Sequence, residues 1–117
     1  MTEINQHFDH VKGDSRLVTI PVVDENGDPK NLSDGSARWR LEAANPVTKS
    51  TAAGTISLVR VNGASGELDA LQFTIVPADT IGLTPAPYKH EAEFIDNLGN
   101  VSTVTQGHVR LKDHIIV

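Results

Sequence analysis

The chain has 117 residues, no cysteine and a formal net charge of −5 at pH 7. The length suits one domain that can bury a core of its own, and the lack of thiols excludes disulfide scaffolds, cysteine-ligated metal sites and thiol catalysis. The acidic balance argues against nucleic acid and anionic membranes as partners. No apolar run approaches the ~18 residues of a membrane helix, and the first residues lack the basic and apolar regions of a secretion signal. We therefore expect a soluble, acidic protein of one domain.

The chain opens with a possible arm, residues 1–10, which is followed by the first clear strand pattern. Phe8 and Val11 could lie on an edge strand of the same domain, or the arm could reach a neighbouring subunit. From 16 to 23, apolar side chains fall on every second residue, the period that places them on one face of a pleated strand. The core residues expected from this strand are Val18, Ile20 and Val22.

The turn after this strand invites a comparison with calcium-binding loops. Residues 24–29 are rich in turn formers and contain the spacing Asp24-x-Asn26-x-Asp28. An EF-hand loop needs glycine at its sixth position and glutamate at its twelfth, where this sequence has a proline and a glycine. We therefore predict a hairpin turn without a metal ion.

The segment at 36–42 separates apolar from basic side chains. Trp39 and Leu41 share one parity and are expected in the core, whereas Arg38 and Arg40 share the other and are expected on the outer face. The arginines would face the glutamates of a neighbouring strand as a ladder of ion pairs, each contributing ~0.2–1 kcal/mol. This basic stripe is also a candidate interface contact.

Weaker strand patterns follow at 55–61 and 68–75, and then comes the only helical hint. A single turn near 78–83, capped by Asp79 or Thr80, is too short to be an independent helix and is expected to cross between two sheets. The core residues expected from the second of these strands are Phe73 and Ile75.

Two further strands are expected at 88–94 and 101–111. His90 has the parity of the inner face, so we expect a core or interface histidine whose ring is hydrogen-bonded, rather than a metal ligand. The later strand changes parity around Gly107, where a bulge or bend is expected. The core residues expected from the two strands are Tyr88, Phe94, Val109 and Leu111.

The last residues, 113–117, end on apolar side chains. A free apolar strand is an edge that pairs with other chains, and a monomer would be expected to blunt it. Both termini are therefore candidate assembly elements, with pairing inside the same domain as the alternative. The interface candidates from the whole sequence are Phe8, Val11, Arg38, Arg40, Ile115, Ile116 and Val117.

No constellation in the sequence indicates catalysis or a cofactor. His7 and His10 are three residues apart, which would place them on opposite faces of a strand, and they are not part of an HExxH motif. Ser65 is one residue short of a G-x-S-x-G elbow, and there is no phosphate-binding glycine loop. We expect a non-enzymatic protein with no catalytic residues, no metal, no cofactor and no small-molecule substrate. The strand and turn pattern as a whole indicates an all-β sandwich or barrel.

Six motifs follow one another between residues 11 and 112, namely Lys12-Gly13-Asp14-Ser15, Val23-Asp24-x-x-Gly27-x-Pro29, Gly66-Glu67-Leu68, Pro77-Ala78-Asp79-Thr80, Pro87-Tyr88-Lys89-His90-Glu91 and Asp96-x-x-Gly99-x-Val101. Their order resembles that of a known family. The immunoglobulin-like β-sandwich domain of tailed-bacteriophage structural proteins, the type at the N-terminus of siphophage upper baseplate proteins, is the family that it resembles. This implies a single immunoglobulin-like sandwich over 1–117, with about seven or eight antiparallel strands.

The resemblance also implies a function. A stand-alone copy of this domain would be a virion protein, assembled in the bacterial host cytoplasm, that docks through sheet edges and termini to other virion proteins and to copies of itself. Its expected position is the tail, baseplate or neck. The alternatives are capsid head decoration or anchoring of a fibre and, from other classes, a receptor- or glycan-binding module or a small hydrolase or metal enzyme.

Overall fold

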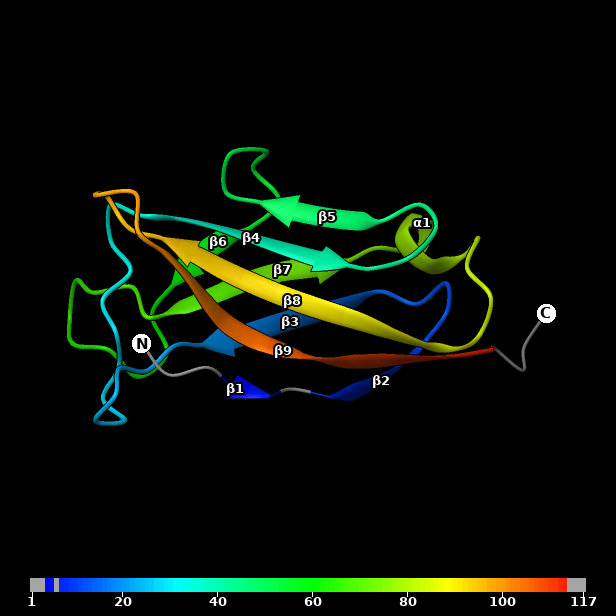
Figure 1. Ribbon diagram of the computed structural model, residues 1–117, viewed down its shortest axis with the longest axis horizontal. Helices are drawn as coiled ribbons and strands as arrows, with labels where there is room; N and C mark the ends of the chain where they lie inside the picture. Colours follow the sequence, from blue (N-terminus) through cyan, green and yellow to red (C-terminus); the bar gives the residue numbers. More distant parts are fainter. Residues whose placement is uncertain (1–3, 6, 114–117) are drawn as a thin grey trace.

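Two β-sheets pack face to face (Figure 1). They enclose one layer of apolar side chains. The structure is a computed structural model in which residues 4–5 and 7–113 are described. The expected all-β sandwich with one short helical turn is confirmed. In chain order its elements are β1 (Ile4–Asn5), β2 (Phe8–Val11), β3 (Arg16–Pro21), β4 (Ser36–Leu41), β5 (Val47–Ser50), β6 (Ser57–Val59), β7 (Ala70–Ile75), α1 (Pro77–Thr80), β8 (Pro87–Ile95) and β9 (Val101–Lys112).

The larger sheet has the order β9-β8-β4-β5, with β1 and β2 both paired to the outer edge of β9, and β3-β7-β6 form the smaller sheet. β1 and β2 run parallel to β9, so the expectation of antiparallel strands throughout is wrong at this edge. The reason is the connection: the chain leaves β2 for β3 in the other sheet, and no hairpin forces β2 to run against β9. Phe8 and Val11 accordingly pair with β9 inside the domain.

The chain changes sheet in the connections β2–β3, β3–β4, β5–β6 and β7–β8. With β9-β8-β4-β5 facing β3-β7-β6, this is the connectivity of a variable-type immunoglobulin sandwich, G-F-C-C′ against B-E-D. At the start of β8, the Tyr88 hydroxyl donates a hydrogen bond to the carbonyl oxygen of Thr84 at 2.5 Å. A tyrosine bonded in this way at the same corner is a hallmark of these sandwiches. The fold is therefore immunoglobulin-like in its connectivity as well as in its layers.

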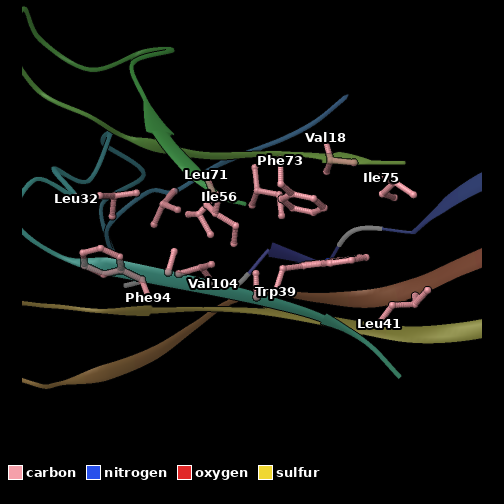
Figure 2. Packing of buried hydrophobic residues seen from close by; sticks show 14 of the residues in the cluster. Val18, Leu32, Trp39, Leu41, Ile56, Leu71, Phe73, Ile75, Phe94 and Val104 are labelled. Atoms are coloured by element: carbon pink, nitrogen blue, oxygen red, sulfur yellow. The ribbon is translucent and has the colours of Figure 1, made fainter. Parts of the chain in front are cut away.

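The core is the layer that the alternating pattern predicted. Figure 2 shows Trp39 between the sheets beside Phe73, and their ring centroids are 4.6 Å apart. Full burial of a large apolar side chain contributes about 1.5–3 kcal/mol. Tyr88 is half-buried against this core. The other expected core residues are all buried, namely Val18, Ile20, Val22, Trp39, Leu41, Phe73, Ile75, Phe94, Val109 and Leu111.

β9 changes face at Val104 rather than at Gly107. Its register against β8 shifts between Thr103 and Thr105, so Val104 has no partner of its own in the pairing. Val104 and Thr105 are both buried, as successive residues can be at a bulge. Gly107 pairs regularly with His90, so the expectation of a bulge around Gly107 is wrong. A glycine has no side chain to assign to either face, and the pattern therefore placed the change too late.

The helical turn α1 carries the chain from β7 in the smaller sheet to β8 in the larger one. The turn begins after Val76, because Pro77 suits the first helical position, where no backbone N–H is needed. The N–H of Val76 donates a hydrogen bond to Asp79 Oδ2 at 2.9 Å. The N-cap residue itself is Val76, and Asp79 caps the turn from the third helical position through this bond, so the expected capping is confirmed for Asp79 and is wrong for Thr80. Thr80 Oγ1 instead accepts the N–H of Gly13 at 2.8 Å. Lys49 Nζ of β5 pairs with Asp79 Oδ2 at 2.7 Å, which fixes α1 to the larger sheet.

Asp24 organises the turn after β3 through its side chain. Its Oδ1 accepts the backbone N–H groups of Asn26 and Asp28. Asp96, between β8 and β9, accepts the N–H groups two and four residues later in the same way. Asp24, the first residue of the calcium-loop spacing, is thus the side-chain acceptor of a hairpin turn, and Asn26 and Asp28 donate to it through their backbones.

A buried carboxylate closes the loop between β6 and β7. Asp69 is 1% exposed, and its Oδ1 and Oδ2 accept the N–H groups of Val61 at 2.7 Å and Asn62 at 2.9 Å. Burial alone would raise the pKa of Asp69, but these bonds and one from Gly63 outweigh burial and hold the pKa below its ordinary value of 3.8. The carboxylate therefore stays ionised inside the protein.

Candidate functional site

The outer face of the larger sheet carries charged side chains that alternate with the core residues. On β4, Arg38 and Arg40 are exposed while Trp39 between them is buried. The register places Arg38 opposite Glu93 of β8 and, one row further, Arg40 opposite Glu91. This agrees with the basic stripe facing two glutamates that the sequence predicted.

The two arginines differ in their surroundings. Arg38 Nη2 lies 2.5 Å from Glu93 Oε2, and Arg38 Nε donates to the same oxygen at 2.7 Å. Arg40 makes no ion pair or hydrogen bond with any residue that the structure describes. Glu91, its neighbour on β8, accepts a long hydrogen bond from the Thr103 hydroxyl at 3.4 Å. Arg40 is therefore a charged group available to a molecule outside the chain.

A third row continues the pattern with the charges exchanged. The N–H of Glu42, the residue after the end of β4, donates to the carbonyl oxygen of Lys89 on β8 at 2.8 Å, which sets the two exposed residues side by side. The sequence pattern alone did not single out Glu42 and Lys89, because their pairing depends on the register. The three rows form what we call the charge ladder, consisting of Arg38, Arg40 and Glu42 with Glu93, Glu91 and Lys89.

The charge ladder lines an open hollow of about 1010 Å³. The hollow extends from Thr48 and Ser50 on β5 to His7 and His108 at the opposite edge of the sheet. The rings of the two histidines stack with centroids 5.6 Å apart, and the N–H of His108 donates to His7 Nδ1 at 3.0 Å. Hydroxyls and imidazoles on this face are thus separated by β4 and β8, and the arrangement suits binding to a charged surface.

Behind this face, His90 is part of the core. It is 3% exposed, and its Nδ1 accepts the indole N–H of Trp39 at 3.1 Å. Phe8 meets the imidazole ring edge-on, with centroids 5.5 Å apart. The expectation of a core histidine with a hydrogen-bonded ring is confirmed. His90 stands two residues after the corner Tyr88, the position at which antibody domains carry the second cysteine of their disulfide.

The other interface candidates lie away from the charge ladder. Phe8 is half-buried, and the guanidinium carbon of Arg16 lies 4.6 Å from its ring centroid. Val11 is half-buried at the end of β2. Both residues therefore contribute to the packing of the domain itself. The apolar candidates at the end of the chain lie outside the described residues, namely Ile115, Ile116 and Val117.

Within residues 4–5 and 7–113, no three His, Asp or Glu side chains are grouped as ligands for a metal ion. Among these same residues, no helix has the length and apolar character to cross a membrane. No family model matches the chain, and no curated protein matches it. An inference about function therefore depends on the sequence motifs, the fold and the charge ladder.

Proposed function

We propose that the chain is a non-enzymatic structural protein of a tailed bacteriophage, a component of the tail, baseplate or neck that assembles in several copies. The observation that carries the proposal is the agreement between motifs and fold. The ordered motifs resemble a phage immunoglobulin-like domain, and the connectivity is that of an immunoglobulin-like sandwich. One fold hosts many functions, so the motif order, rather than the sandwich alone, supports the phage assignment.

The motifs coincide with turns that the fold requires. Gly13, Gly27, Gly66 and Gly99 each belong to a different motif, and all have φ between 82° and 85°. Such angles suit glycine because it has no Cβ to clash with the backbone. The motif order therefore reports the order of tight turns in the sandwich, which a related structural domain would share.

In this role the chain acts through its surfaces. Its partners would be other virion proteins and further copies of itself, and its location would be the assembled virion. The free edge of β5 and the charge ladder offer contacts of modest strength, which symmetric repetition adds up in a particle. Head decoration or anchoring of a fibre would use the same surfaces at a different position.

A receptor- or glycan-binding module is the second candidate, favoured by the open hollow on the outer face. Sugar sites use exposed aromatic rings, but Trp39 is 1% exposed and belongs to the core. Titration with oligosaccharides tests this candidate: we expect no change in Trp39 fluorescence, and a saturable quench would favour glycan binding over the structural role.

The virion role is tested on particles from a phage or prophage that encodes the chain. We expect mass spectrometry of purified virions to find the chain in several copies per particle, and labelled antibody to mark the tail end in electron micrographs. Label on the capsid would favour head decoration instead. Absence of the chain from intact, infectious particles would overturn the proposal.

A further inference from the structure

The two strands of the charge ladder carry opposite charges at matching heights. Along β4 and the residue that follows it the signs run plus, plus, minus, and along β8 they run minus, minus, plus. The six charges sum to zero, whereas the whole chain carries −5. An approaching copy of this acidic protein would therefore meet no net repulsion from the ladder itself.

We propose that two copies of the chain dock face to face through the charge ladder, related by a two-fold axis that runs along the strands between β4 and β8. Rotation by 180° about this axis exchanges β4 with β8 and keeps each row at its height. Arg40 then faces Glu91 of the second copy, and the other two rows are matched in the same way. The interface is isologous, as in most homodimers.

Each row becomes a square of four alternating charges in this arrangement. Arg38 already has Glu93 beside it in the single chain, whereas Arg40 has no ion pair there among the described residues. Docking gives Arg40 a carboxylate from the second copy in addition to its own neighbour. On the flanks, β5 with the hydroxyls of Thr48 and Ser50 faces β9 of the second copy with Gln106 and His108.

The alternative face-to-face axis, perpendicular to the strands, gives a worse match. Centred on the middle row, it would place Arg40 over Arg40 of the second copy and Glu91 over Glu91. Like charges that face each other are destabilising in sheets and suppress wrong pairings at interfaces. The ladder therefore selects the axis as well as the face.

The dimer should be weak and sensitive to salt. Charge complementarity sets the orientation of the two copies and their association rate more than their affinity. The axis along the strands also brings the loops around Asp24 and Asp96 of both copies to the same end of the dimer, where their negative charges repel. At ~0.15 M salt, charges more than about 8 Å apart are largely screened, whereas close contacts persist. We therefore choose this ionic strength for the measurements.

The first experiment is sedimentation equilibrium of the whole chain. We expect the average mass to rise toward twice the monomer mass with increasing concentration, and to fall back in ~1 M salt, where the Debye length is about 3 Å. A chain that stays monomeric at ~0.5 mM, where even a Kd near 1 mM is detectable, would overturn the proposal.

Charge reversal tests the axis. Arg40→Glu and Glu91→Arg each place like charges over one another twice, so we expect each variant alone to associate at least about tenfold more weakly than the unmodified chain. Mixed in equal amounts, the two variants are complementary again and should form a heterodimer. Unchanged association of either single variant, or a mixture that does not associate, would contradict the geometry.

A matched control changes the same charge elsewhere. Arg60 is exposed in the loop that follows β6 of the smaller sheet, away from the charge ladder. The variant Arg60→Glu should therefore leave the association of the dimer unchanged. Fluorescence of the buried Trp39 reports that each variant is folded. The proposal goes beyond the virion role and does not depend on it: a monomeric chain found in virions would refute only the dimer, and a dimer absent from virions would refute only the role.

Discussion

The indole N–H of Trp39 donates a hydrogen bond to Nδ1 of His90, 3.1 Å away, inside a core without cysteine. In antibody domains the tryptophan of the same strand packs against a disulfide. Here an imidazole occupies the position of one of its cysteines and gives the indole a polar partner. The central contact of the sandwich therefore depends on a hydrogen bond rather than on oxidation.

Replacement of His90 by leucine should lower the free energy of unfolding by about 1–3 kcal/mol, because the buried indole N–H loses its acceptor. The double variant Trp39→Phe with His90→Leu should cost less than the sum of the two single variants, since no donor is then left unsatisfied. Urea unfolding followed by circular dichroism measures both. Additive costs would show that the hydrogen bond contributes little.

Asp69→Asn should lower the free energy of unfolding by about 1–3 kcal/mol at pH 7, because the loop N–H groups lose an ionised acceptor. The pKa of Asp69 is below its ordinary value of 3.8 in the folded protein, so its contribution is complete above that value and is lost as the pH falls through the folded pKa. The stability of the variant should therefore fall less between pH 4 and pH 2. Glu67→Gln, in the same loop, is the control, and an equally steep loss in both variants would contradict the role of Asp69.

Lys49→Met should lower the free energy of unfolding by about 3 kcal/mol, because it leaves the largely buried Asp79 carboxylate without its cation. Lys112→Met is the matched control, since Lys112 pairs with Asp9 at 3.0 Å but both side chains are 52% exposed; we expect less than about 1 kcal/mol there. Thermal unfolding of both variants measures the contrast. Equal costs would mean that burial does not strengthen the Lys49 pair.

Gly35→Ala should destabilise the domain by about 1–3 kcal/mol, because the added methyl group overfills a packed site. A Cβ there would overlap the ring of Phe94 and lie 2.8 Å from the carbonyl oxygen of Ile95. Gly82→Ala is the control: its Cβ would meet open space, and its stability should be unchanged or raised by up to ~1 kcal/mol. Denaturant midpoints compare the two, and a neutral Gly35 variant would contradict the packing argument.

Much of the fold could be predicted because a strand that buries one face must alternate. Val18, Ile20 and Val22 follow this rule, and each is buried. β5 was missed because it is short and places Lys49, a charged residue, toward the interior, where the ion pair with Asp79 compensates for burial. An alternating pattern would assign a lysine to the outer face. The sequence around Lys49 therefore gives no strand pattern, because the acid that allows its burial, Asp79, is far away in the sequence.

The candidate site could be predicted only in part. The parity of Arg38 and Arg40 placed them on the outer face, and the register confirmed their glutamate neighbours. The third row, Glu42 with Lys89, depends on which residues of β4 and β8 meet, and a pattern of period two does not determine the register of two strands. The buried carboxylate of Asp69 was missed for a related reason: its acceptor role depends on the path of a loop.

The parallel pairing of β2 with β9 has a mechanical consequence. The chain enters this edge at β1, opposite Thr105, and leaves it at Lys112, beside Val11. Tension that pulled these two points apart would act parallel to the strands and would shear the hydrogen bonds between them. These hydrogen bonds would then have to break together rather than one after another. A domain with this pairing transmits force along the strands without extending until all the hydrogen bonds between β2 and β9 break.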